Sequence, residues 1–223
     1  MKTLQVRIET PSGTSLAASL DQPEGNYTAI ALFAHCFTCS KDILAASRIS
    51  RRLVAQGFAV LRFDFTGLGA SEGDFADTNF SSNIQDLVAA GAWLQHNYQS
   101  PSLLIGHSLG GTAILAAAQQ FPDAKAFVTI GSPSDPRHIS KLIDERSLEE
   151  IEAQGDAEVN LGGRRFHMKK QFFLDAMEQR VLQQVRNLKR PLLVMHSPED
   201  TQCRLSTLQL SSMPLRTLRA LCP

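Results

Sequence analysis

The sequence predicts an α/β domain built on a mostly parallel sheet with helices on both faces. Short runs of consecutive apolar residues recur along the chain, and such runs are typical of strands buried on both sides. Segments with apolar residues at helical spacing separate these runs, which indicates βαβ units. The 223 residues, of which 43% are hydrophobic, are enough for one sizeable core. We therefore expect one domain rather than several.

The expected elements follow one another in a regular order. A hairpin comes first, with strands at residues 4–9 and 16–20 around a Pro-Ser-Gly-Thr turn, and it adds antiparallel strands at one edge of the sheet. Apolar runs predict the later strands, and helical spacing predicts the helices between them. The expected strands cover residues 29–34, 58–63, 102–105, 126–130 and 191–195, and the expected helices cover residues 43–56, 82–96 and 109–120.

Two segments depart from this alternation. Residues 132–187 carry many charges and a second expected hairpin around Gly162 and Gly163. We expect them to form a small cap over the C-terminal edge of the sheet, where ligands bind in such folds; a surface excursion with no substrate role is the alternative. Residues 202–223 form an atypical tail without Asp, Glu or Gly, and without a pattern for a final strand and helix. The core is thus expected at residues 1–201.

A Gly-His-Ser-Leu-Gly motif at residues 106–110 stands where an expected strand meets an expected helix. In this G-x-S-x-G context the serine lies on a tight, strained turn, which closes because glycines flank it two residues away. The hydroxyl of Ser108 would stand at a helix N-terminus, where developing negative charge is stabilised. The motif predicts Ser108 as a nucleophile and the N–H of Leu109 as an oxyanion donor. The alternative is a glycine-rich turn with an incidental serine.

A second oxyanion donor is expected at the end of the strand at residues 29–34. That strand runs into His35, Cys36 and Phe37. In serine hydrolases with such an elbow, the corresponding loop is glycine-rich after its histidine and supplies a backbone N–H. We expect the N–H of Phe37 to be this donor, with Cys36 where glycine is usual. His35, Cys36, His107 and His196 are expected to border the pocket.

Cys36 and Cys39 have the C-x-x-C spacing that redox pairs and zinc knuckles share. No thioredoxin-like helix is expected to open at the pair, and the other two cysteines, Cys203 and Cys222, are 19 positions apart, which is no knuckle spacing. We expect two structural thiols and no bound metal.

A glycine-rich loop at residues 64–73 has the spacing G-x-G-x-x-x-G, one residue longer than the dinucleotide fingerprint. We therefore expect a structural loop and no cofactor.

The acid of a catalytic triad is expected after the last apolar run. Asp200 follows the strand at residues 191–195, and the chain order of serine before aspartate is the usual one. Asp135, after the strand at residues 126–130, is the alternative acid.

The catalytic base is missing from its usual place. No histidine follows Asp200 in the sequence, and His196, four residues before that acid, is the nearest candidate to replace it. A shifted reading frame or a truncated gene would produce such a tail; a diverged pseudoenzyme is the other account. The six histidines of the chain are His35, His96, His107, His138, His167 and His196.

Several motifs together resemble one family. They are His-Cys-Phe-Thr-Cys-Ser-Lys-Asp at residues 35–42, Arg-Phe-Asp-Phe-Thr-Gly-Leu-Gly at 62–69, Phe-Ser-Ser-Asn at 80–83, the elbow at 106–110, Gly-Ser-Pro-Ser-Asp-Pro at 131–136 and His-Ser-Pro-Glu-Asp at 196–200. The chain resembles bacterial α/β-hydrolases that are often fused to an OsmC-type, peroxide-reducing domain. The resemblance runs to about Thr201 and then stops, which favours the frameshift account.

The resemblance implies an eight-stranded α/β-hydrolase core with Ser108 and Asp200 as triad members. It also implies a base in a Gly-Ala-Asp-His-like loop and a fused domain, and we expect this chain to lack both. We therefore expect a serine hydrolase of the esterase type, weakened or inactivated. A non-catalytic binding module of the same fold is the alternative.

Composition excludes several partner classes. Lys plus Arg equals Asp plus Glu, so no basic field attracts nucleic acid or anionic membrane. The first residues contain no apolar signal region, and nowhere do about 18 apolar residues run together. We expect a cytoplasmic protein that acts on a small acyl or ester molecule; its oligomeric state is not predicted.

Overall fold

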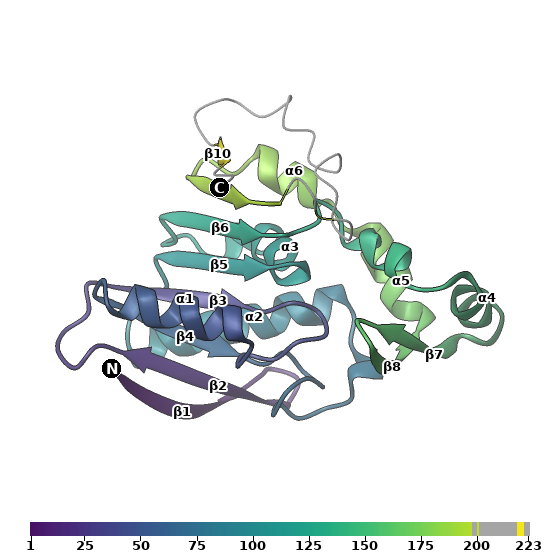
Figure 1. Ribbon diagram of the computed structural model, residues 1–223, viewed down its shortest axis with the longest axis horizontal. Helices are drawn as coiled ribbons and strands as arrows, with labels where there is room; N and C mark the ends of the chain where they lie inside the picture. Colours follow the sequence, from purple (N-terminus) through teal and green to yellow (C-terminus); the bar gives the residue numbers. More distant parts are fainter. Residues whose placement is uncertain (198–199, 201–217, 221–223) are drawn as a thin grey trace.

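A twisted eight-stranded sheet runs through the computed structural model (Figure 1). The structure describes residues 1–197, residue 200, and the backbone of residues 218–220. The strands of this sheet are β1 (Lys2–Glu9), β2 (Ser15–Gln22), β3 (Ala29–Ala34), β4 (Phe58–Phe63), β5 (Leu103–His107), β6 (Ala126–Ile130), β9 (Leu192–Met195) and β10 (Leu218–Ala220).

The order of the strands is that of a mostly parallel sheet with an antiparallel edge. Within the described residues the order is β1-β2-β4-β3-β5-β6-β9-β10. The pairs β1–β2 and β2–β4 are antiparallel, and every other neighbouring pair is parallel. The leading hairpin therefore forms the antiparallel edge, as predicted.

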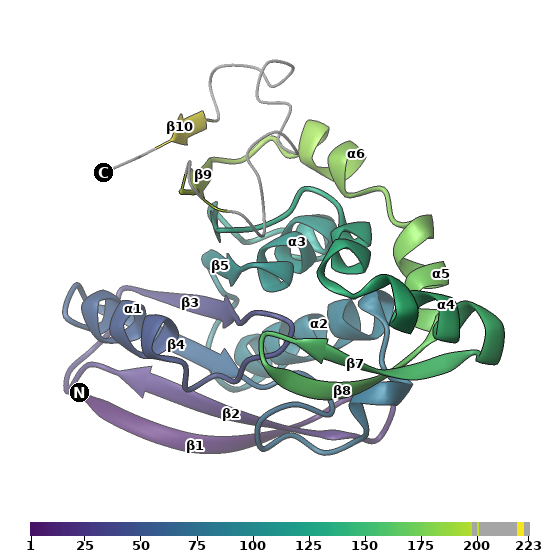
Figure 2. The same cartoon turned by 45° about the vertical axis from the view of Figure 1, so that its right-hand side comes forward.

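Helices cover both faces of this sheet (Figures 1 and 2). One face carries α1; the other carries α2, α3 and α6, with short 3₁₀ turns between some of these elements. Their bounds are α1 (Leu44–Val54), η1 (Phe75–Asp77), α2 (Phe80–Asn97), α3 (Leu109–Ala116), η2 (Ala118–Gln120) and α6 (Val181–Arg186).

The side chains of β3 alternate between the two faces of the sheet, which explains why a helix must cover each face. Successive side chains of a strand point to opposite faces. Leu32 is buried in the cluster that contains residues of α2 and α3, whereas its neighbour Phe33 is buried in the cluster that contains residues of α1. Since neither face can remain in water, the whole strand is apolar, and this continuous run is what made β3 predictable from sequence.

The predicted elements are confirmed, with shifts at some ends. The strands expected at residues 29–34, 58–63 and 126–130 have those bounds. Helix α2 begins two residues earlier than expected because Asn79 caps it: the Asn79 side chain accepts the Ser82 N–H at 2.7 Å, and the Asn79 N–H donates to the Ser82 hydroxyl at 2.9 Å. The helix expected at 109–120 is divided into α3 and η2.

One expectation about the tail is wrong. The sequence shows no strand pattern after residue 201, yet β10 pairs in parallel with β9, Leu218 opposite Leu192. A three-residue strand that pairs through its backbone needs no alternation of side chains, so no pattern announced it. The other expectations for the tail concern residues 201–217 and 221–223, which lie outside the described residues.

Most of the segment expected to form a cap, up to residue 178, lies at the carboxyl ends of the parallel strands, whereas its last part is α6 on a face of the sheet (Figures 1 and 2). It contains η3 (Pro136–Leu142), α4 (Glu145–Gln154), β7 (Asp156–Leu161), β8 (Arg164–Lys169) and α5 (Lys170–Glu178). The hairpin expected here is confirmed: β7 and β8 pair antiparallel, and Gly162 and Gly163 form the turn with φ of 61° and 81°. Across the described residues, no helix combines the length and the apolar character that a membrane span requires.

Candidate active site

Ser108 occupies a strained corner between β5 and α3. Its backbone has φ 52° and ψ −126°, and no other non-glycine residue in the described part of the chain has a positive φ. Such a conformation is unfavourable for any residue with a Cβ atom and persists only where neighbours hold it. Here the Ser108 N–H donates to the carbonyl of Ile130 at 2.9 Å, and the Ser108 carbonyl accepts the Gly111 N–H at 2.9 Å.

The glycines around Ser108 are required by close approaches of backbone. A Cβ atom on Gly106 would lie 2.4 Å from Cα of Gly111, and one on Gly110 would lie 2.3 Å from the carbonyl oxygen of His35. Real Cβ atoms do not come this close to backbone, so both positions exclude larger residues. The second contact also joins the elbow to the end of β3, where the other expected oxyanion donor lies.

The two residues that carry the predicted oxyanion donors, Phe37 and Leu109, line one small cavity, and Phe37 also lines a larger one that contains Ser108. Leu109 is the first residue of α3, so its N–H has no acceptor within the helix and lies at the positive end of the helix dipole. Phe37 lies three residues beyond the end of β3, and its ring packs against Phe75 and Phe172 with centroids 5.0 and 4.9 Å away. These aromatic contacts fix the loop that carries the Phe37 N–H.

A cavity of about 240 Å³ opens above Ser108. Its wall is shared by the oxyanion loop, the elbow, the expected cap and the expected acid, so segments far apart in sequence meet there. The residues that matter for the chemistry and the entry of a substrate are Cys36, Phe37, His107, Ser108, Leu161 and Asp200. The tip of the β7–β8 hairpin closes one side, because the Arg164 guanidinium donates to the carbonyl of Thr38 at 2.8 Å.

Of the two candidate acids, Asp200 lines this cavity with Ser108. Its carboxylate is about one-fifth exposed, and Nε2 of His196 lies 3.7 Å from its Oδ2. Asp135 caps η3 instead and forms an ion pair with Arg137, whose Nε donates to Oδ2 at 2.8 Å. Burial raises the pKa of Asp135, but hydrogen bonds from Arg137 outweigh burial and leave that pKa below its ordinary value. Asp135 is therefore engaged in a structural pair.

The histidines expected near the pocket have different surroundings. His107 lines the cavity, and burial lowers the pKa of its ring although Asp200 acts to raise it, so the imidazole is neutral near pH 7. His196 is almost fully buried beside Asp200. His35 is not among the residues that line the cavity above Ser108; it lines a smaller cavity of about 10 Å³ together with Phe37 and Leu109.

Both ring nitrogens of His35 hold the backbone of neighbouring loops together. Its Nδ1 donates to the carbonyl of Cys36 at 2.6 Å, and its Nε2 accepts the Phe65 N–H at 3.3 Å. Burial lowers the pKa of His35 to about 4, against the opposing effects of the Cys36 carbonyl and Asp64. The neutral ring thus links the loop after β3 to the loop after β4.

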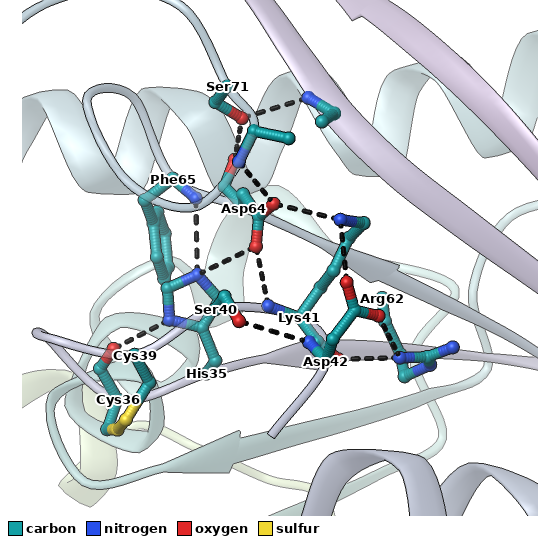
Figure 3. Close-up of polar contacts among 12 residues, drawn as sticks. His35, Cys36, Cys39, Ser40, Lys41, Asp42, Arg62, Asp64, Phe65 and Ser71 are labelled. Carbon is teal, nitrogen blue, oxygen red and sulfur yellow. Dashed lines mark hydrogen bonds and ion pairs between the residues drawn. A yellow bond between two sulfur atoms is a disulfide. The ribbon is translucent and has the colours of Figure 1, made fainter. Parts of the chain in front are cut away.

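A buried network that sequence reasoning missed supports the oxyanion loop (Figure 3). Asp64 is fully buried and accepts the Lys41 N–H at 2.5 Å, the Lys41 ammonium at 3.0 Å and the Ala70 N–H at 3.0 Å. The glycine-rich loop closes around this carboxylate, since a Cβ atom on Gly69 would lie 2.3 Å from it. The signal was present in the sequence as Lys41 and Asp64 in two loops that follow buried strands, but spacing alone does not show that they meet.

Cys36 and Cys39 are joined in a disulfide, which corrects the expectation of two free thiols. The Cys39 N–H donates to the carbonyl of Cys36 at 3.1 Å, and this tight turn brings the two side chains together. Sequence spacing alone did not distinguish a bonded pair from two thiols. The two sulfurs and a ring nitrogen of His107 all lie within 4.8 Å of one another, so these three side chains could hold a metal ion.

A mostly parallel sheet with a serine on a strained strand-to-helix corner defines an α/β-hydrolase fold. The model of the Hydrolase_4 family, described as serine aminopeptidase, S33, matches residues 28–148, more than half of the 223 residues. The chain belongs to this family.

Individual proteins that are similar to this chain have the same fold, and hydrolases are among them. The esterase domain of a Rhodothermus marinus protein is 44% identical and superposes with a TM-score of 0.76, over 99% of this chain and 88% of that one. The mitochondrial palmitoyl-protein thioesterase ABHD10 of Rattus norvegicus is 34% identical over 80 residues, 35% of this chain and 26% of that protein. An uncharacterized protein, RP471, of Rickettsia prowazekii is 32% identical over 39% of this chain.

The similarity to the curated relatives is confined to part of their length. The matched segments span 36% of RP471 and 26% of rat ABHD10. The chain is thus similar to hydrolases, and the family and fold support hydrolase chemistry in general terms.

Proposed function

We propose that this chain is a serine hydrolase of the esterase or acyl-hydrolase type, with Ser108 as its nucleophile. The observation that carries the proposal is the strained backbone of Ser108, at the N-terminus of α3 and open to a cavity that Asp200 also lines. Residues with a strained backbone conformation of this kind cluster at functional sites. The esterase domain that is 44% identical to this chain supports an ester as substrate, and the partial match to a thioesterase supports acyl chemistry more widely.

The chemistry would be transfer of an acyl group to water. The Ser108 hydroxyl loses its proton to a base as its oxygen attacks the carbonyl carbon of an ester or thioester. The N–H groups of Leu109 and Phe37 stabilise the oxyanion, the alcohol or thiol leaves with a proton, and water then releases the acid from the acyl-enzyme. Asp200 is the acid that would orient the base and stabilise its charged form.

We expect this chemistry to be slow in the 223-residue chain because no histidine follows Asp200. Loss of the triad histidine costs on the order of 10⁴–10⁶ in kcat, while the oxyanion hole retains part of the rate enhancement. The same absence favours a second candidate, a non-catalytic module that binds an acyl compound in the cavity above Ser108.

The expected cap at residues 132–187 would select the substrate. Leu161 from the hairpin and Ile139 from η3 contribute apolar wall to the cavity, which suits the acyl part of a small molecule. The resemblance to hydrolases that are fused to OsmC-type domains stays a prediction.

Labelling with a fluorophosphonate probe tests the proposal. The purified chain is incubated with the probe and its intact mass is followed with time, with Ser108→Ala as the control. Stoichiometric labelling that Ser108→Ala abolishes would support a serine hydrolase, and His196→Gln would then show whether that histidine serves as base. A folded chain that takes up no probe but binds an acyl compound in calorimetry would support the binding module.

A further inference from the structure

The C-x-x-C turn lies directly against the elbow. Cys36 and Cys39 belong to the loop after β3, His107 is the last residue of β5, and β3 and β5 are neighbours in the sheet. Because parallel neighbours end at the same edge, the turn and the histidine meet there, and one atom from each of the three side chains lies within 4.8 Å of the others. The family's hydrolytic chemistry uses neither of these sulfurs.

One ring nitrogen of His107 has no hydrogen-bond partner within the part of the chain that the structure describes. Its Nδ1 is buried, and no group in the described residues forms a hydrogen bond with it. A buried polar atom without a partner is costly, and in native proteins it commonly marks a place for an ion or water. A neutral imidazole nitrogen and two cysteine sulfurs form a donor set that suits a soft or borderline divalent cation.

We propose that the reduced forms of Cys36 and Cys39, together with His107, bind a thiolate-preferring divalent cation such as Zn²⁺. An external dithiol first reduces the disulfide and is itself oxidised to a disulfide, which leaves two thiols on the chain. Zn²⁺ then binds both sulfurs as thiolates, with release of two protons, and binds the neutral imidazole. No metal binds while the disulfide is intact, because its sulfurs carry no negative charge.

The spacing of the three side chains fits such a site. In a tetrahedral zinc site with bonds of about 2.3 Å to sulfur and about 2.0 Å to nitrogen, the ligand atoms lie roughly 3.5–3.8 Å apart. Reduction breaks the bond between the two sulfurs, so these two atoms move apart to reach this spacing, while both already lie within 4.8 Å of a ring nitrogen of His107. Cys36 is buried, and Cys39 and His107 are half-buried, so the site is shielded without being closed.

Three protein ligands leave the fourth position open. Cys36 and His107 line the cavity of about 240 Å³ above Ser108, which has room for a bound water or a small anion at that position. A metal there would occupy the space beside the Phe37 N–H. Inhibition of the hydrolase by Zn²⁺ is the expected consequence, and this part of the inference rests on the proposed function.

The expectation of no metal site followed from the spacing of the cysteines alone. Cys203 and Cys222 cannot complete a knuckle with the C-x-x-C pair on sequence spacing. The structure supplies a histidine from the neighbouring strand instead, which a search for paired cysteine motifs does not find.

The test is a Co²⁺ titration of the full chain in which Cys203→Ser and Cys222→Ser leave only the C-x-x-C cysteines. The reduced protein is titrated without oxygen, and absorption is recorded for thiolate-to-cobalt charge transfer and for the visible bands of tetrahedral Co²⁺. We expect one Co²⁺ per chain, displacement of these bands by Zn²⁺, and no bands in the oxidised protein. Bands in the oxidised protein, or none in the reduced and folded protein, would overturn the proposal.

Single substitutions identify the ligands. Cys36→Ser and Cys39→Ser should abolish the charge-transfer bands, and His107→Gln should weaken Co²⁺ binding by at least about tenfold, a loss that even outer partners of metal ligands can produce. His167→Gln is the matched control, because His167 is an exposed histidine on β8 that pairs with Asp156. Equal binding by His107→Gln and the control would overturn the three-ligand site. Since absorption requires no catalysis, a failed probe-labelling experiment leaves this test intact.

Discussion

A Cβ atom on Gly110 would lie 2.3 Å from the carbonyl oxygen of His35, so the start of α3 and the end of β3 are in direct backbone contact. This contact determines the distance between the elbow and the oxyanion loop. The Leu109 N–H precedes Gly110 by one residue, and the Phe37 N–H follows His35 by two. The separation of the two proposed oxyanion donors is therefore set by backbone packing.

Gly110→Ala should disrupt this contact. The added methyl group meets backbone carbonyls, which cannot move aside as a flexible side chain can, so we expect a loss of about 3 kcal/mol or more in the free energy of unfolding, the upper end for overpacking. Urea unfolding measures this loss. Gly25→Ala is the matched control, because a Cβ atom there meets nothing within 4 Å. Equal stabilities of the two variants would show that α3 and β3 are not held in contact.

Ser108→Gly should give a more stable chain than Ser108→Ala. Alanine retains the unfavourable φ of 52°, whereas glycine adopts it freely. Relief of such strain is worth about 1–3 kcal/mol, and the greater entropy of glycine in the unfolded state removes about 0.5–1 kcal/mol of that gain. The expected difference is about 1 kcal/mol in favour of glycine, measured by urea unfolding. An alanine variant as stable as the glycine variant would mean that Ser108 is not strained in solution.

Those parts of the molecule that depend on local pattern were predictable from sequence. The apolar run of β3 and the glycines around Ser108 each express a local requirement, burial on two faces or closure of a turn. Ser108 and Asp200 were paired from chain order and from the position of each after a strand, and in the structure both residues line one cavity.

The features that were missed depend on contacts between distant segments. The ion pair of Lys41 with Asp64 joins loops after two different strands, and β10 pairs through its backbone alone. The link that the His35 ring makes between the Cys36 carbonyl and the Phe65 N–H was not predicted either. Neither spacing nor composition shows such orientations.

Asp64→Asn should destabilise the chain far more than Asp42→Asn. Both carboxylates pair with Lys41 at 3.0 Å, but Asp64 is fully buried while Asp42 is 60% exposed. Asp64→Asn leaves the Lys41 ammonium with the exposed Asp42 as its partner and turns an amide N–H towards buried N–H donors, so we expect a loss towards the about 3–5 kcal/mol of a broken buried pair, whereas an exposed pair contributes about 0–1 kcal/mol. Urea unfolding of both variants checks this. Similar losses for the two would show that Asp64 does not anchor the oxyanion loop.

The pH dependence of the free energy of unfolding should show that His35 is buried and neutral in the folded chain. Burial lowers its pKa from 6.5 to about 4, so between these values the unfolded chain binds a proton that the folded chain does not. Stability from this residue is complete above about pH 6.5 and decreases as the pH falls towards 4, by about 3 kcal/mol in total. The difference in unfolding free energy between the native chain and His35→Asn should therefore shrink by this amount on acidification.

Asp86 acts in the opposite direction, so the pH profile of the native chain by itself hides the effect of His35. Burial raises the pKa of Asp86 to about 6, despite hydrogen bonds from Thr66, so the folded chain gains stability from this carboxyl as the pH falls from about 6 towards 4. In the native chain the two effects largely cancel across this range. Asp86→Asn should therefore unfold at clearly lower urea concentration at pH 4.5 than at pH 7, while the native chain changes less. A flat pH profile for Asp86→Asn would contradict the neutral, buried state of His35, because the other buried groups with lowered pKa, such as Asp21 and His107, lose stability in acid in the same direction and cannot offset it.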